Sequence, residues 1–271
     1  MGSIGSIFRY SFMIRAMLVG IPVSLCAALL GVSLVLKRYS MIGDGLSHVG
    51  FGAMAIAVAM HWSPLPVAIP VVILAAFLLL RLRNDSRIKG DTAIALISTS
   101  ALALGVMVVS ATSGLNSDVS SYMFGSIYAV GEEDVILSLS LALVVLVLFV
   151  LLYNRIFAVT FDETFSKATG VKADLYNMLI AVLTAVTVVL GMRMMGALLI
   201  SALIVFPATS AMRICRSFRA VVLCAACISV CCFFAGLVAS CLLPLPPGGC
   251  IVAANAVVFG IFSLAARIKA G

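Results

Sequence analysis

The stretch LKRYSMIGDGLSHVGFGAMAIAVAM, from Leu36 to Met60, combines a basic turn with a long and nearly apolar segment. From Met41 onward, its ionisable side chains are those of Asp44 and His48, four residues apart. Positions i and i+4 lie on the same face of a helix. Gly52 continues this face and allows close packing against a neighbouring helix. The stretch therefore predicts an apolar helix that carries a carboxylate and an imidazole side by side.

A helix of this kind suits a lipid bilayer, and the composition of the whole chain agrees. Of the 271 residues, 64% are hydrophobic and only 10% are charged, whereas soluble domains carry about 25% charged residues. A soluble fold of this composition would expose large apolar patches. The net charge of +7 lies in short clusters between apolar runs, which is typical of membrane proteins and does not indicate nucleic-acid binding. We therefore expect an all-α, polytopic membrane protein.

The apolar segments have lengths suited to crossing about 30 Å of hydrocarbon, which takes roughly 20 helical residues. The first resembles a signal-peptide core, but it is longer and ends at Lys37 and Arg38, so we interpret it as a span. Short connections predict a single domain over residues 1–271 with eight or nine transmembrane helices. The segments cover residues 12–36, 42–60, 64–80, 92–111, 134–153, 173–191, 194–212, 219–243 and 250–266.

Lysine and arginine predict the orientation, because cytoplasmic loops of membrane proteins are the more basic ones. The opposite set of loops includes the acidic run at 132–134 and is expected outside, which places the C-terminus inside. Nine full spans would then place the N-terminus outside, against Arg9 and Arg15. A short first element or a broken segment would remove that conflict. The basic set carries Lys37, Arg38, Arg81, Arg83, Arg87, Lys89, Arg155, Lys167, Lys172, Arg213, Arg216, Arg219, Arg267 and Lys269.

Two segments are expected to be discontinuous. The stretch from Gly191 to Arg213 contains Gly196 and Pro207, and a proline inside a helix predicts a kink because it removes a backbone donor. The stretch SSYMFGSIYAVGEED, residues 120–134, is too short and too polar to span. It predicts a partial helix on the outer side, where irregular backbone is tolerated only if protein or a cavity surrounds it.

Asp44 and His48 are the candidate transport residues. A charge at the membrane centre costs on the order of 3 kcal/mol, so ionisable residues in spans usually mark a substrate path. Carboxylate and imidazole also suit divalent first-row metals. The alternative is that Asp44 caps the helix after Gly43 and that His48 is an ordinary packed histidine.

The segment FDETFSKATGVKAD, from Phe161 to Asp174, is polar and lies on the basic side. Acidic residues at its start and Lys167 later suit a short helix aligned with its dipole, and Gly170 suits a C-terminal cap. The pattern predicts a docking helix on the cytoplasmic face. An ordinary connecting turn is the alternative.

The eight cysteines include Cys224, Cys227 and Cys231, which share one helix face. We interpret them as small packing residues in a span, with a soft-metal site as the alternative. The chain lacks G-x-x-x-x-G-K-[ST], G-x-S-x-G and H-E-x-x-H, so it has no recognisable phosphate loop or hydrolase motif. We expect no catalytic residues and no enzymatic activity in this chain itself.

Four segments, in order along nearly the whole chain, resemble the permease subunits of ABC importers for zinc, manganese or iron, the ABC-3 metal permease family. They are LKRYSMIGDGLSHVGFG, FDETFSKATGV, MGALLISALIVFPATSAMR and LPPGGCIV, which begin at residues 36, 161, 195 and 245. The resemblance implies a type II ABC importer-like permease in the bacterial cytoplasmic (inner) membrane. It places Asp44 and His48 on the metal pathway. A coupling helix near residues 162–170 would contact the ATPase through Glu163, Ala168 and Gly170.

The same resemblance implies the partners. They are a second permease copy or a paralogue, cytosolic ABC ATPase subunits, an external metal-binding receptor and membrane lipid, with no nucleic acid. ATP would act at the partner subunit, and the divalent metal would be cargo rather than a permanently bound cofactor.

Two other classes of function remain open on the residues alone. One is a stand-alone secondary transporter or channel that uses Asp44 and His48 as a proton relay. The other is a membrane enzyme that uses them as acid and base. The donor set does not choose among zinc, manganese and iron.

Overall fold

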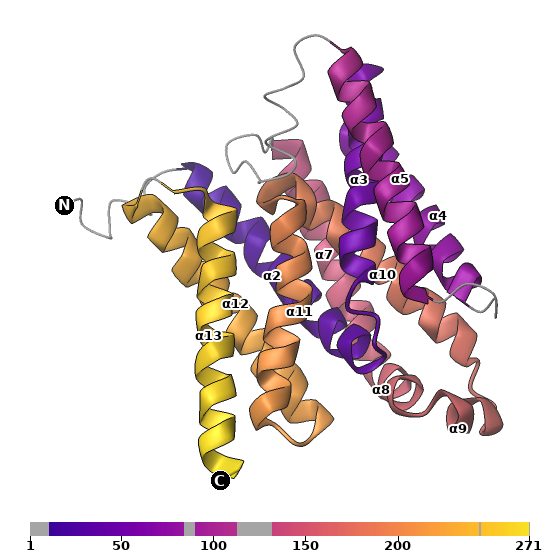
Figure 1. Cartoon of the computed structure of the whole chain (residues 1–271), viewed down its shortest axis with the longest axis vertical. Coiled ribbons are helices and arrows are strands. Elements are labelled where there is room, and N and C mark those ends of the chain that lie inside the picture. Colours follow the sequence, from indigo (N-terminus) through magenta and orange to yellow (C-terminus); the bar gives the residue numbers. More distant parts are fainter. Residues whose placement is uncertain (1–10, 84–89, 113–131, 244, 271) are drawn as a thin grey trace.

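Helices alone form the part of the chain that the computed structural model describes, which covers residues 11–83, 90–112, 132–243 and 245–270 (Figure 1). The expected all-α fold is therefore confirmed. The helices are α2 (Ser11–Leu36), α3 (Ile42–Ala59), α4 (Pro64–Arg83), α5 (Gly90–Ala111), α7 (Glu132–Leu151), α8 (Tyr153–Phe161), α9 (Glu163–Ala168), α10 (Ala173–Met195), α11 (Ala197–Ile214), α12 (Phe218–Leu242) and α13 (Pro247–Ala270).

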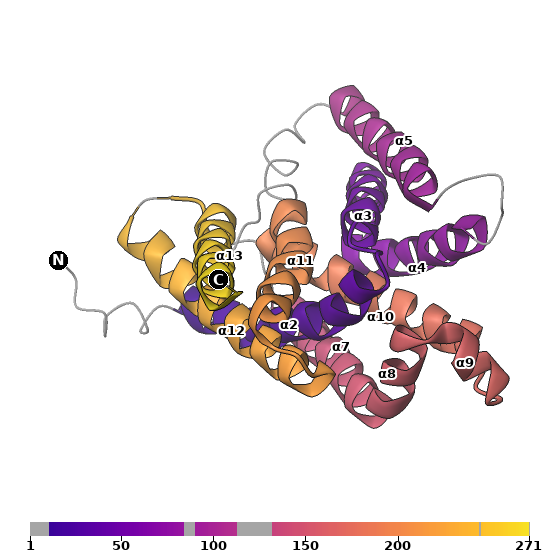
Figure 2. The same cartoon turned by 60° about the horizontal axis from the view of Figure 1, so that its bottom comes forward.

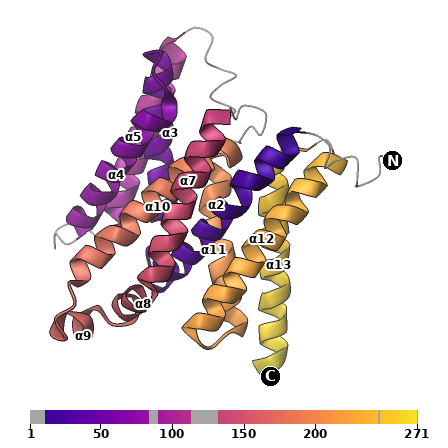
Figure 3. The same cartoon turned by 180° about the vertical axis from the view of Figure 1, so that it is seen from behind.

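Eight of the described helices are long and apolar enough to cross a membrane, and α7 with α8 can provide a ninth crossing. These two helices meet at Leu152 with a bend of 69°. Figure 3 shows α7 running beside α2, while α8 turns away at the end where α9 lies. The prediction of eight or nine transmembrane helices is confirmed.

The start of α2 and the end of α13 lie at opposite ends of the bundle (Figure 1). At the start of α2, Arg15 Nη2 lies 2.5 Å from Glu132 Oε1 at the start of α7. The basic α2–α3 and α11–α12 connections lie at the other end, with α9. Arg15 is therefore on the side predicted to be external. Glu132 offsets the charge of Arg15 there. Because α2 is a helix of 26 residues, a short first element does not explain why Arg15 lies on that side.

α2 runs through the centre of the bundle and packs against α7, α10, α11 and α12. Its backbone approaches α11 closely at Gly31, where an added Cβ would lie 2.1 Å from the carbonyl oxygen of Ile204. α3 approaches α5 in the same way, since a Cβ on Gly52 would lie 2.7 Å from the carbonyl oxygen of Ala101. Small residues at such contacts let membrane helices pack tightly, as expected for Gly52.

The predicted interruption between Gly191 and Arg213 lies at Gly196, which alone connects α10 to α11. Gly196 has a φ of 84°, a conformation that side chains with a Cβ rarely adopt. Pro207 lies inside α11, which continues to Ile214, and the kink at Pro207 stays a prediction. Of the partial helix expected at 120–134, residues up to 131 lie outside the described part of the chain, and Glu132 begins α7.

Candidate functional site

α3 carries its two ionisable side chains at the only positions in its first fourteen residues that are not buried. From Ile42 to Ala55, every residue except Asp44 and His48 is buried. The side chain of His48 is 21% exposed and that of Asp44 is 37% exposed. Because ionisable groups are costly within a membrane, their presence at the accessible positions of a packed helix favours a polar path over a packing role.

The carboxylate and the imidazole lie together, with His48 Nε2 3.6 Å from Asp44 Oδ2. From α11, Ser201 places its Oγ 3.4 Å from Asp44 Oδ1. Ser47 takes no part in this group, because its hydroxyl donates to the backbone carbonyl of Asp44 at 2.7 Å. One carboxylate, one imidazole and one hydroxyl thus come together from α3 and α11, and this donor set suits a divalent first-row metal.

The start of α3 bears on the alternative role of Asp44 as a helix cap. The helix begins at Ile42 and its N-cap is Met41, so Asp44 is the third helical residue. The cap interpretation is therefore wrong about where the helix begins. The carboxylate still lies in the first turn, where it interacts favourably with the helix dipole.

The donors among the described residues do not by themselves complete a metal site. In the described ranges, no group of three or more His, Cys, Asp or Glu side chains is placed to hold a metal ion. Any ion held by Asp44 and His48 would need further ligands, from water or from a partner. Such an incomplete set is compatible with an ion that passes through rather than one that stays.

The face of α11 that carries Ser201 is partly open. Leu198 precedes Ser201 at helical spacing, and Ala202, Val205 and Thr209 follow it. None of these four residues is buried. α13 packs against α11, and only 11% of its span is buried. Figure 2 shows α5, α3, α11 and α13 on one side of the molecule, with α2, α7 and α12 on the other. This side thus carries apolar helix surface that the described chain covers only in part.

A separate short helix, α9, lies between the bent end of α8 and the start of α10. Asp162 caps it by accepting a hydrogen bond from the Phe165 N–H at 2.8 Å. At the other end, Gly170 has a φ of 82° and its N–H donates to the Lys167 carbonyl at 3.1 Å. Gly170 thus lies just beyond the helix in a left-handed conformation, where glycine is the usual residue. Ala168 ends the helix and is exposed.

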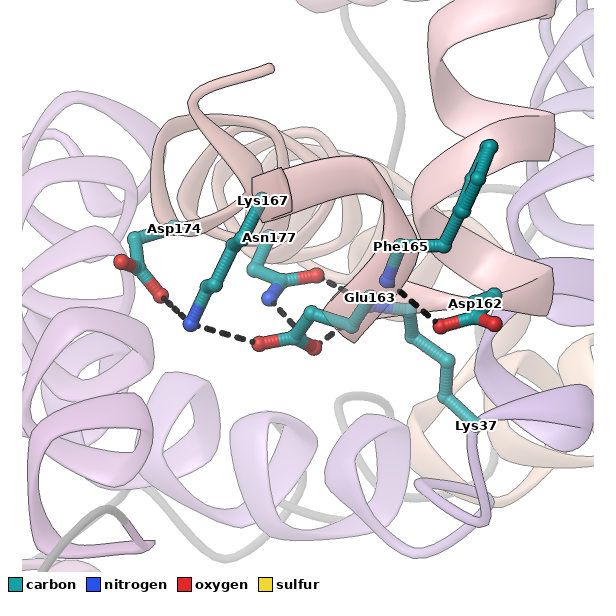
Figure 4. Close-up of polar contacts among 7 residues, drawn as sticks. All are labelled: Lys37, Asp162, Glu163, Phe165, Lys167, Asp174 and Asn177. Carbon is teal, nitrogen blue, oxygen red and sulfur yellow. Dashed lines mark hydrogen bonds and ion pairs between the residues drawn. The ribbon is translucent and has the colours of Figure 1, made fainter. Parts of the chain in front are cut away.

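Glu163 is the centre of a polar network (Figure 4). Its Oε2 accepts a hydrogen bond from Asn177 Nδ2 at 3.0 Å and lies 3.4 Å from Lys37 Nζ. Lys37 also donates to Asn177 Oδ1. On the other side, Lys167 Nζ lies 3.1 Å from Glu163 Oε1 and 2.9 Å from Asp174 Oδ1. The network joins the end of α2 and the starts of α9 and α10.

The network keeps Glu163 ionised. Partial burial would raise the pKa of its carboxyl group, but hydrogen bonds from Asn177 and Lys167 and the charges of Lys37 and Lys167 outweigh burial and lower it. The pKa of Lys167 is raised by its hydrogen bonds to Asp174 and then Glu163. Because the pKa of Glu163 is lowered in the folded chain, its ionised carboxylate stabilises the fold at neutral pH. This stabilisation is lost as the pH falls through the lowered pKa.

Comparison with known proteins identifies the family. The model of the family described as "ABC 3 transport family" matches residues 9–266, which is nearly the whole chain. The chain belongs to the ABC 3 transport family. The resemblance predicted from four sequence segments is thus confirmed.

Two relatives and one solved structure illustrate the ABC 3 membership. The "Manganese import system permease protein ScaB" of Streptococcus parasanguinis is 28% identical over 93% of this chain and 89% of its own length. A "Probable iron transport system membrane protein" of Haemophilus influenzae is 31% identical, over 93% and 89%. The structure described as PsaBC from Streptococcus pneumoniae in complex with Fab matches with a TM-score of 0.86 and 27% identity, over 96% of this chain and 93% of that one. The chain thus has the fold of an ABC transporter permease.

Sequence reasoning missed two participants in the sites of this ABC 3 permease. Ser201 was only one hydroxyl in an apolar span, and its contact with Asp44 joins residues 157 positions apart. Asn177 has a visible polar signal in the sequence, since its amide lies one turn after Asp174 at the start of an apolar span. The Cys224, Cys227 and Cys231 face gains no metal role, since no metal-holding group involves it within the described residues.

Proposed function

We propose that this chain is the membrane-spanning subunit of an ATP-driven importer for a divalent transition metal, with zinc, manganese and iron as the candidate cargoes. The observation that carries the proposal is the position of Asp44 and His48, the only residues from Ile42 to Ala55 that are not buried. Family membership and relatives named for manganese and iron transport support it.

In this proposal, Asp44 supplies an anionic oxygen and His48 supplies a nitrogen to the passing ion. Ser201 lies 3.4 Å from Asp44 and helps to hold the carboxylate in place. The open faces of α11 and α13 pack against a second permease copy or a paralogue, so that the pathway lies between two subunits. An external receptor delivers the metal to this pathway.

α9 would couple the permease to a cytosolic ATPase subunit. The side chains of α9 are mostly exposed. Phe165 is 65% exposed, and Phe161, the last residue of α8, is exposed to the same extent. Exposed aromatic residues on a surface that faces water are typical of protein–protein interfaces. Asp162 and Gly170 fix the two ends of the helix, so the helix is presented as a preformed unit. The chain itself would carry out no ATP hydrolysis.

The division of labour gives a first prediction. Purified alone in liposomes, the chain is expected to show no ATP hydrolysis and no metal uptake, because it has no phosphate loop of its own. Adding the ATPase and receptor subunits should start metal uptake that depends on ATP. Radioactive zinc or manganese accumulation measures this. Strong uptake by the chain alone without ATP would contradict the proposal and favour a secondary transporter.

The geometry of Gly170 gives a second prediction. Gly170→Val should reduce receptor-stimulated ATP hydrolysis and metal uptake several-fold, because a left-handed conformation costs a residue with a Cβ about 1–2 kcal/mol. The effect is one of strain rather than of a clash, since an added Cβ would meet no other heavy atom of the described chain within 4 Å.

Gly170→Asn is the matched control, because asparagine tolerates the left-handed region. It should retain most of the coupling. Both variants are measured in the reconstituted complex, with the amount of bound ATPase determined in each. Equal coupling in Gly170→Val and the unmodified complex would show that the shape of this segment does not matter for coupling.

A further inference from the structure

Lys37 is a lysine at a buried position, and its burial needs a reason. It directly follows α2, and its side chain is only 8% exposed. A buried ammonium group is costly unless it is paired and hydrogen-bonded. Its partners include side-chain oxygens of Glu163 and Asn177, which lie 126 and 140 residues further along the chain (Figure 4). Lys37 is thus a point at which three distant segments meet.

On the side of α9, this link is one of the contacts that hold the helix in place. Of the six residues of α9, only Ser166 is buried. The first residue of the helix, Glu163, directs one carboxylate oxygen toward Lys37 and Asn177 and the other toward Lys167. Its carboxylate is therefore committed to contacts within this chain. Phe165 is among the exposed residues of α9.

On the side of α3, Lys37 is joined to Asp44 through a short and hydrogen-bonded connection. The Arg38 N–H donates to the Val35 carbonyl at 3.0 Å, and the Tyr39 N–H donates to the Leu34 carbonyl at 2.8 Å. The Ile42 N–H then donates to the Tyr39 carbonyl at 3.0 Å. α3 begins at this point, and Asp44 is its third residue. These hydrogen bonds restrain the backbone between Lys37 and Asp44. A displacement of Lys37 would therefore be passed on to Asp44 and His48.

We propose that Lys37 is a positioning residue which, through its contact with Glu163, transmits movement of α9 to the first turns of α3 and so to Asp44 and His48. The contact and the turn after it form a continuous physical connection of the kind that carries coupling between distant sites. Neither Lys37 nor Glu163 belongs to the group proposed to handle the ion. The inference rests on the proposed function, in which α9 meets the ATPase and Asp44 and His48 handle the ion.

The test uses the complete reconstituted complex with the variant Lys37→Met, which keeps most of the apolar stem and removes the amine. Metal imported per ATP hydrolysed should fall about tenfold, within the range that residues along coupling networks produce. Lys37→Arg restores a cation able to reach both oxygens and should recover most of the ratio. Arg38→Met removes the neighbouring, exposed cation and should leave the ratio unchanged.

A second measurement does not depend on transport. Backbone amide exchange at residues 38–48 should change when a non-hydrolysable nucleotide binds the unmodified complex, and this change should be lost in Lys37→Met. Glu163→Gln is the milder second variant should Lys37→Met fail to assemble, and it should give the same loss. A nucleotide response at residues 38–48 that is as large in these variants as in the unmodified complex would overturn the link. Absence of ATP-dependent metal uptake by the unmodified complex would instead overturn the proposed function.

Discussion

Asp44→Asn is expected to lower metal uptake by more than about tenfold, since loss of even an outer partner of a metal ligand costs 10- to 100-fold. The substitution keeps the shape of the side chain and removes the negative charge of the carboxylate, whose two oxygens face His48 and Ser201. Membrane insertion should not suffer, because removing a charge from a span eases insertion. His48→Ala should have an effect of similar size through loss of the imidazole. Zinc or manganese accumulation, normalised to the amount of assembled complex, is the measurement.

Asp91→Asn is the matched control for the first of these changes. Asp91 is also an acidic residue in the first turn of an apolar helix, α5, but it is exposed. The same loss of charge there should leave uptake close to normal. Normal uptake by both Asp44→Asn and His48→Ala would return the pair to a packing role and leave the pathway without assigned residues.

The pairing of Asp44 with His48 could be predicted from the sequence because it is local. Two residues four apart on a helix share a face whatever surrounds the helix. That they are also the accessible residues of α3 could not be predicted, because nearly every other residue around them is apolar or small as well. Which of these is buried depends on where α4, α5, α10 and α11 pack against α3.

Lys37 illustrates the opposite case. Its position after an apolar run made it one of many cations that predict orientation. Its specific role depends on Glu163 and Asn177, and the sequence contains no local sign that these residues meet it. Arg15 shows a related difference, since the charge rule alone assigns it to the cytoplasmic side, whereas Glu132 receives it at the opposite end of the bundle.

The observed helix boundaries differ from the predicted ones where the geometry of a turn, rather than a change in hydrophobicity, ends the helix. The segment predicted to end near residue 191 continues to Met195, because the chain reverses only at Gly196. Similarly, α8 continues the chain beyond the predicted span as a helix that is apolar on one face, with Ile156 and Val159 buried. Apolar content alone marks the membrane-crossing part of a helix and not its full length.

The contact between α2 and α11 connects both sites, since Lys37 directly follows α2 and α11 carries Ser201. Gly31→Ala is expected to disrupt it severely. The added Cβ would lie 2.1 Å from the carbonyl oxygen of Ile204 and 2.9 Å from its carbonyl carbon. Because these are backbone atoms, no side-chain rotation can relieve the overlap, and α2 and α11 must separate. Overpacking typically costs 1–3 kcal/mol, and about the upper end of that range is expected here.

Gly260→Ala provides the comparison. Gly260 lies in α13, and a Cβ there would have no other heavy atom of the described chain within 4 Å. Within a helix, alanine is favoured over glycine by roughly 0.5–1 kcal/mol, so this variant should be at least as stable as the unmodified chain. Midpoints of thermal unfolding in detergent and yields of monodisperse protein should therefore fall sharply for Gly31→Ala and stay level for Gly260→Ala. Equal midpoints and yields for the two variants would mean that α2 and α11 are not held together by direct backbone contact at Gly31.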